Sequence, residues 1–197
     1  MTSTTWYLIL IGAVALERLA ELVVSTRNAR WSFARGGVET GLGHYPAMVA
    51  LHAGLLVAAP AEVLLAPRPF VAWLGWPMLA AVGLSQALRW WCIGSLGRHW
   101  NTRVIVVPGA RLVASGPYRW LRHPNYLAVA VEGAALPLVH TAWLTAIGFT
   151  TLNLLLMRAR LTAENAALDG VRGVGGAPAD ASGVAATADT DAGRPVG

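Results

Sequence analysis

The 197-residue sequence contains no lysine, a single cysteine and few charges of either sign. Only 13% of its residues are charged and its mean hydropathy is +0.51, values too apolar for an ordinary soluble domain of this length. The lone Cys92 excludes an intramolecular disulfide framework and a cysteine-based metal cluster. No histidines or carboxylates have zinc-like spacing on one element, so we expect no metal site. The composition is therefore that of a membrane protein.

All fifteen basic residues are arginine, and the formal net charge is +5. A basic balance can indicate nucleic-acid binding, but here the arginines flank apolar segments instead of forming a solvated basic face. We therefore expect no nucleic-acid partner and assign the arginines to membrane topology.

Long apolar runs are abundant, and a membrane span needs about twenty helical residues. Four regions are long enough: 6–24, 45–65, 69–88 and 126–157. The fourth is longer than one span requires, and Pro137 disfavours helix at the residue before it, which predicts two closely joined helices at 125–138 and 141–159. The predicted fold class is thus all-α: a polytopic membrane protein of about five transmembrane helices, the last two forming a helical hairpin.

Arginine positions predict the orientation of these spans. With the N-terminus outside, the inner segments are 25–44, 89–123 and 158–197, and they hold thirteen of the fifteen arginines. Arg68 alone lies outside, and Arg18 lies within a span. This arrangement satisfies the positive-inside rule and predicts a cytoplasmic C-terminus. We expect an integral protein of a bacterial plasma membrane, where the bacterial source rests on the resemblance described below.

Three parts of the chain are predicted. Residues 1–88 contain the first three helices, and 89–173 contain a loop, the helical hairpin and the end of the last helix. Residues 174–197 are Gly, Ala, Asp, Thr and Pro with little large enough to bury, which predicts a disordered tail. Within the second part, β-branched runs on each side of Pro108 and Gly109 favour a short hairpin or an extended lid.

The stretch GPYRWLRHPNY, residues 116–126, concentrates cations, aromatic rings and one imidazole between apolar segments. Pro124 suits the first turn of the following helix, and Tyr126 would then face back toward His123. Arg119 and Arg122 offer forked donors to a carboxylate or phosphate. The alternative is an interfacial belt in which Tyr118, Arg119 and Trp120 sit at headgroup level by solvation alone.

These residues also resemble a known family. RHPNY after GPYRW, preceded by RWWCIGSLGRHW and followed by RARLTAENAAL, resembles the integral membrane methyltransferases related to isoprenylcysteine carboxyl methyltransferase, over roughly residues 85–168. The N-terminal part resembles the bacterial branch, some members of which O-methylate alkylresorcinols or alkylpyrones. The resemblance implies S-adenosylmethionine bound at the cytosolic face and a lipophilic substrate that enters from the bilayer.

Residues that match the family's motifs are candidate cofactor ligands. They are Gly116, Tyr118, His123, Pro124, Tyr126, Arg160 and Glu164. Two positions depart from the pattern: Asn165 replaces the second Glu of the terminal Arg-x-x-x-Glu-Glu, and Ala128 stands where many relatives have Gly.

The chemistry of these side chains agrees with the resemblance. S-adenosylmethionine is a sulfonium zwitterion, which calls for a guanidinium near its carboxylate and aromatic or carboxylate groups near its cationic centre. Arg122, Tyr126, Arg160 and Glu164 supply these groups. Arg160 and Glu164 lie four residues apart on one helix face, although an ordinary surface ion pair would have the same spacing.

A weakly acidic acceptor needs a general base, because a resorcinol hydroxyl has a pKa near that of tyrosine, ~10. The catalytic candidates are His123, Glu132 and Arg160. Histidine titrates near neutral pH and makes His123 the first choice of base. Glu132, inside the fourth span, is the second, since an intramembrane carboxylate is costly unless it is paired or functional. Its alternative role is a hydrogen bond between packed helices.

Polar residues of the first span have two interpretations. Arg18 and Glu21 are spaced to neutralise one another, and with Glu17 they either orient the helix or line a substrate cavity. The function also has alternatives: RHPNY resembles a motif of NADPH-dependent sterol reductases, and a phospholipid amine acceptor or a non-catalytic transporter stays open. The terminal Arg-x-x-x-Glu favours methyl transfer over reduction, and we expect the acceptor to be an oxygen of a lipidic phenol, enol or carboxylate.

Overall fold

The computed structural model describes residues 2–40, 45–109 and 113–175, with the side chains of Thr40, Arg160 and 163–175 outside the description. Most described residues are helical, as the all-α class predicts. The helices are α1 (Ser3–Phe33), α2 (Tyr45–Leu65), α3 (Ala72–Leu96), α4 (Pro124–Leu138) and α5 (Trp143–Gly175), with short 3-10 helices η2 (Gly97–His99) and η3 (Gly116–Arg119).

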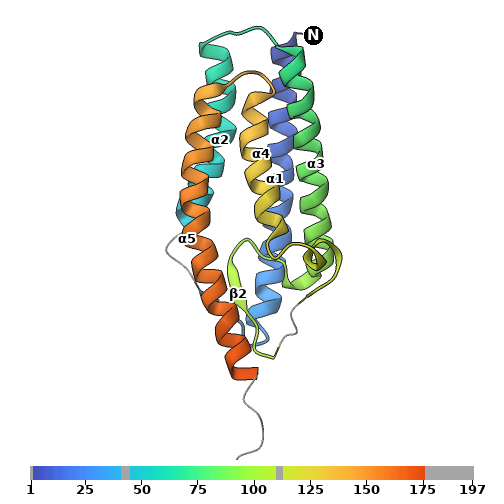
Figure 1. Cartoon of the computed structure of the whole chain (residues 1–197), viewed down its shortest axis with the longest axis vertical. Helices are drawn as coiled ribbons and strands as arrows, with labels where there is room; N and C mark the ends of the chain where they lie inside the picture. Colours follow the sequence, from blue (N-terminus) through green and yellow to red (C-terminus); the bar gives the residue numbers. More distant parts are fainter. Residues whose placement is uncertain (1, 41–44, 110–112, 176–197) are drawn as a thin grey trace, which may run out of the picture.

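The five helices run along the long axis of one bundle (Figure 1). One end holds the N-terminus, the α2 to α3 connection and the α4 to α5 turn. The other end, which we call the loop end, holds η2, η3, the start of α4 and a small sheet. α5 continues past the start of α4 at the loop end (Figure 1), and Tyr126 of α4 and Met157 of α5 line the same pocket.

Two short strands form the sheet at the loop end. β1 (Val38–Thr40) pairs antiparallel with β2 (Val104–Val106), with Val38 opposite Val106. Both strands contact α5, and β2 also contacts α1. The β-branched segment before Pro108 thus pairs with a strand distant in sequence. The short hairpin or extended lid predicted about Pro108 and Gly109 involves residues 110–112, which lie outside the described residues, and it stays a prediction.

Apolar side chains from all five helices and from the α4 to α5 turn form a core in the half of the bundle nearer the N-terminus. The buried members are Tyr7, Ile11, Val14, Leu55, Ala59, Val63, Val82, Ala135, Leu136, Val139, Ala142 and Phe149. The α4 to α5 contact depends on Gly133, because a Cβ there would lie 1.9 Å from the Phe149 ring. Glycine thus allows the two helices to approach closely.

The predicted break after Pro137 is present: α4 ends at Leu138 and α5 begins at Trp143. The new helix start is capped from another helix. The Glu62 carboxylate accepts the backbone N–H groups of Leu144 and Thr145 at 3.1 and 2.8 Å and the Thr145 hydroxyl at 2.8 Å. Because the first N–H groups of a helix have no partner within it, this contact fixes the end of α2 to the start of α5.

Membrane-spanning character is strongest in α2. Among the described residues it is the one helix both long and apolar enough to cross a bilayer; the apolar part of α5, Trp143–Ala159, is shorter. The outside of the bundle is nonetheless rich in large apolar side chains on other helices. Those on α1, α3 and α5 include Leu16, Leu19, Trp73, Trp76, Leu84, Leu144, Ile147 and Leu152.

The structure bears on two of the boundaries predicted between parts of the chain, at residues 88/89 and 173/174. α3 runs through residues 88 and 89, so the predicted first and second parts share one continuous helix. α5 reaches Gly175, and the rest of the predicted tail lies outside the described residues.

Candidate active site at the loop end of the bundle

The segment from Gly116 to Tyr118 is held against the end of α3. Gly116 has φ +58°, and a Cβ there would lie 2.1 Å from the Ser95 hydroxyl oxygen, so glycine is required by both backbone and space. The Tyr118 side chain hydrogen-bonds the thiol of Cys92 on the same helix. These two predicted cofactor ligands therefore also dock the loop onto α3.

His123 and Tyr126 lie together at the start of α4. His123 immediately precedes the helix, and the buried Pro124 occupies its first turn, where the missing N–H costs no intrahelical bond. The rings of His123 and Tyr126 are 5.4 Å apart between centroids at an interplanar angle of 39°. Tyr126 faces back toward His123, as the motif predicts. Arg122, one residue before, is exposed.

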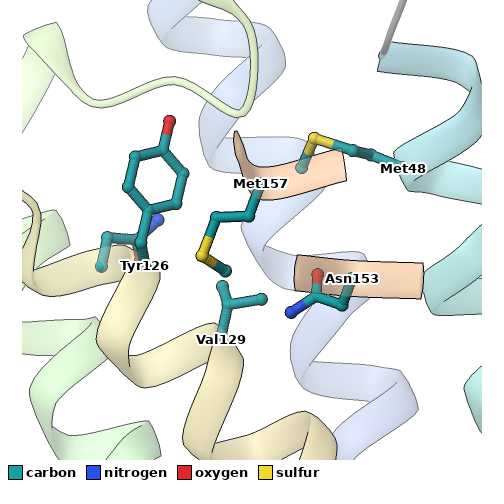
Figure 2. Close-up of a pocket in the computed structure, with 6 residues that line it drawn as sticks. Met48, Tyr126, Val129, Asn153 and Met157 are labelled. Atoms are coloured by element: carbon teal, nitrogen blue, oxygen red, sulfur yellow. The ribbon is translucent and has the colours of Figure 1, made fainter. Parts of the chain in front are cut away.

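Tyr126 also lines a small pocket between α2, α4 and α5, together with Met48, Asn125, Val129, Asn153 and Met157 (Figure 2). The pocket brings the first turn of α4 beside the part of α5 that contains Met157. Arg160 is three residues further along α5, about 4.5 Å along the helix axis, and Glu164 follows one turn later. The side chains of Arg160 and Glu164 lie outside the described residues.

Glu132 belongs to a buried charge cluster that we define as Arg18, Glu21, Arg89 and Glu132. Arg18 and Arg89 both donate to Glu132 Oε2, at 2.9 and 2.7 Å. Arg18 also contacts Glu21 Oε2 at 2.6 Å, and Arg89 Nε lies 3.4 Å from Glu21 Oε1. The cluster joins α1, α3 and α4, and it confirms the predicted pairing of Arg18 with Glu21.

The charge cluster is separate from the loop that contains His123. Glu132 is nine residues beyond His123, about 13 Å along the axis of α4. Its Oε2 oxygen is occupied by two guanidinium groups, whereas His123 lies at the mouth of the bundle. The structure thus brings His123, Pro124 and Tyr126 together at the loop end and places Glu132 deeper in the bundle.

Sequence reasoning missed Arg89, Gln86 and Asn153. The predicted inner segment begins at Arg89, and the structure places this residue within α3, where it is 5% exposed. Gln86 donates to Glu17 and accepts from Arg18. Gln86 and Arg89 lie three residues apart at the end of an apolar run, and polar residues in such a position indicate a buried polar contact, as Glu132 does in its own span.

Comparisons with known proteins agree with the motifs. Residues 78–170 match the profile of the Isoprenylcysteine carboxyl methyltransferase (ICMT) family. Uncharacterized protein YpbQ of Bacillus subtilis is 39% identical over 161 residues, which cover 81% of this chain and 95% of the relative. An uncharacterized protein of Haemophilus influenzae is 24% identical over 163 residues, covering 81% of this chain and 93% of the relative. No solved structure gives a significant match.

Proposed function

Because the chain belongs to the isoprenylcysteine carboxyl methyltransferase family, we propose that it transfers a methyl group from S-adenosylmethionine to a lipophilic acceptor within a membrane. The family is one of membrane methyltransferases, and this supports the reaction class. The proposed methyl acceptor is an oxygen of a lipidic phenol, enol or carboxylate. The observation that carries the proposal is the proximity of the start of α4 to the stretch of α5 that leads to Arg160 and Glu164.

The side chains of the loop end fit the proposed cofactor in chemical character. S-adenosylmethionine supplies an electrophilic methyl group on a cationic sulfur. The paired rings of His123 and Tyr126 offer aromatic faces for a cationic centre, and Arg160 and Glu164 contribute the guanidinium and carboxylate that a zwitterion needs. In the proposal, Gly116, Tyr118 and Pro124 shape this site, and Arg122 adds positive charge at its edge.

The chain's own groups do two things in this mechanism. His123 would accept the proton of the acceptor hydroxyl, and apolar surroundings would exclude water that competes with the acceptor. S-adenosylmethionine, when bound, would supply the methyl group and leave as S-adenosylhomocysteine, since its carbon–sulfur bond is the one that breaks. Holding the reactants in line lowers the barrier of such a displacement, because the entropy of bringing them together is lost on binding. We assign Glu132 to support of the helices, because both arginines of the charge cluster donate to one of its oxygens.

The membrane arrangement is part of the proposal. We propose five spans with the N-terminus outside and the C-terminus in the cytoplasm of a bacterial cell. The many large apolar side chains that are exposed on α1, α3 and α5 support burial of these helices in lipid. The loop end, which carries Arg103, Arg119 and Arg122, would then face the cytoplasm.

Mass spectrometry of lipid extracts tests the function directly. Cells that express the wild-type protein should contain a lipid heavier by one methyl group than its counterpart in cells that express His123→Ala. When methionine with a deuterated methyl group is supplied in the medium, the added methyl group of this lipid should carry the deuterium. A complete lipid comparison in which no species gains a methyl group would contradict the proposal.

A further inference from the structure

The pocket between α2, α4 and α5 is small but contains two side-chain amides. Its cavity volume is about 20 Å³, which is room for about one water molecule. Asn125 and Asn153 approach it from α4 and α5, and the remaining lining residues are Met48, Tyr126, Val129 and Met157. None of these lining residues carries a formal charge.

Asn153 is the less expected of the two amides. It is 4% exposed and lies within the apolar part of α5, between Leu152 and Leu154. Its amide is directed toward the pocket, beside the Met157 side chain (Figure 2). A side-chain amide within an apolar helix needs hydrogen-bond partners, which either a neighbouring helix or a bound ligand can supply.

Asn125 supplies a second observation at the same pocket. Its Oδ1 oxygen is buried and has no hydrogen-bond partner among the described residues. Buried polar atoms are nearly always hydrogen-bonded, so this acceptor calls for a donor from outside the described residues, either an ordered water or a group of a bound ligand. Because the described lining residues are uncharged, a ligand group without formal charge fits them better than a carboxylate, which would find no counter-ion among these six residues.

Met157 fills the space that such a group would occupy. Its side chain lies between Tyr126 and Asn153 (Figure 2). Methionine has three rotatable bonds and adapts to irregular spaces, so this side chain can move aside at low cost. The pocket can therefore enlarge without movement of the helices.

The position of the pocket relates it to the proposed cofactor site. Asn153 is seven residues before Arg160, about 10 Å along α5 and toward the interior of the bundle. Tyr126 belongs to both the pocket and the proposed cofactor site. A group held in the pocket would thus lie next to the proposed cofactor site, on its side toward the interior of the bundle.

We propose that this pocket binds the polar head of the methyl acceptor. The amides of Asn153 and Asn125 hydrogen-bond an uncharged head group that has both a donor and an acceptor, such as a hydroxyl, and Met157 moves aside to admit it. This inference rests on the proposed function and assigns substrate specificity to residues outside the family's motifs.

Four single variants in detergent micelles test the inference. Asn153→Leu removes the amide at similar volume, and its control is Thr151→Val, an exposed polar position on the same helix. Met157→Ala enlarges the pocket, and its control is Leu155→Ala, which is 57% exposed. The probes are an alkylresorcinol and a prenylcysteine as acceptors, and S-adenosylhomocysteine as the cofactor analogue. Methyl transfer, thermal stabilisation by each acceptor and equilibrium binding of the analogue are measured.

We expect Asn153→Leu to raise the KM for the alkylresorcinol about tenfold, which corresponds to the loss of one buried hydrogen bond. It should also weaken the thermal stabilisation by that acceptor, while the affinity for S-adenosylhomocysteine stays unchanged. Met157→Ala should lower the KM, and both controls should behave as wild type. Wild-type enzyme should prefer the alkylresorcinol to the prenylcysteine.

Three results would overturn the inference. An unchanged KM in Asn153→Leu would remove the amide from acceptor binding. Equal loss of acceptor and S-adenosylhomocysteine binding would assign the pocket to the cofactor, although methyl transfer itself would stand. A wild-type protein that binds no S-adenosylhomocysteine would instead defeat the proposed function, and the inference with it.

Discussion

The charge cluster offers a quantitative test of how the bundle is held together. Arg89 contacts Glu132 at 2.7 Å and Glu21 at 3.4 Å, and its side chain is 6% exposed. Arg89→Met leaves Arg18 as the one guanidinium of the cluster for two buried carboxylates. Removing one partner of a buried pair costs about 3–5 kcal/mol. Because Arg18 still contacts both carboxylates at 2.6 and 2.9 Å, we expect the lower value, about 3 kcal/mol.

Unfolding of the purified protein in mixed detergent micelles measures this change in the free energy of unfolding. Arg103→Met is the matched control, because Arg103 pairs with Glu39 at 3.3 Å and its side chain is 43% exposed. An exposed pair contributes little, so the control should lose less than about 1 kcal/mol. The difference between the two variants isolates the effect of burial.

A second replacement separates electrostatics from packing. Arg89→Met combined with Glu132→Leu removes a positive and a negative charge together, and buried ion pairs replaced by apolar residues are often neutral in stability. We therefore expect the double variant to be more stable than Arg89→Met alone. If Arg89→Met is no more destabilising than Arg103→Met, or if the second replacement only adds further loss, the cluster does not stabilise the bundle as described.

Three further predictions concern the site and the helix contacts. His123→Ala should abolish methyl transfer to a weakly acidic phenol while it spares S-adenosylhomocysteine affinity more than Arg160→Ala does; equal loss of affinity in both variants argues against the base assignment. Gly133→Ala should destabilise the bundle by about 1–3 kcal/mol through overpacking, measured by thermal unfolding, whereas Gly148→Ala, with open space around it, should not; equal behaviour would refute the close α4 to α5 contact. Glu62→Ala should cost about 2 kcal/mol in the same assay, because two N–H groups and a hydroxyl at the start of α5 lose their acceptor; unchanged stability would contradict that role.

Features with local causes could be predicted from the sequence. The boundary between α4 and α5 follows from Pro137 and the length of the apolar run, and the observed start of α4 lies within one residue of the prediction. The His123 and Tyr126 contact follows from a proline at the first helical turn and a spacing of three residues. In each case the signal and the structure it determines lie within a few residues of one another.

Features that depend on distant residues could not be predicted in this way. Glu132 pairs with Arg18 and Arg89, which are far away in sequence, and no pattern around any of them names its partners. Val104–Val106 likewise has the composition of a strand but gives no indication that its partner is Val38–Thr40.

The pocket depends on three helices that meet, and its lining residues carry no shared sequence pattern. Asn153 did carry a signal, since an amide within an apolar helix is unusual. That signal gained meaning once Met157 and Tyr126 were known to lie beside it.

Equilibrium binding of S-adenosylhomocysteine and of NADPH to the same purified, membrane-reconstituted protein tests the central claim most directly. The account predicts saturable binding of S-adenosylhomocysteine that weakens in Glu164→Gln, and no saturable binding of NADPH. Saturable NADPH binding without any for S-adenosylhomocysteine would contradict it and would make the loop end of the bundle the site of a reductase.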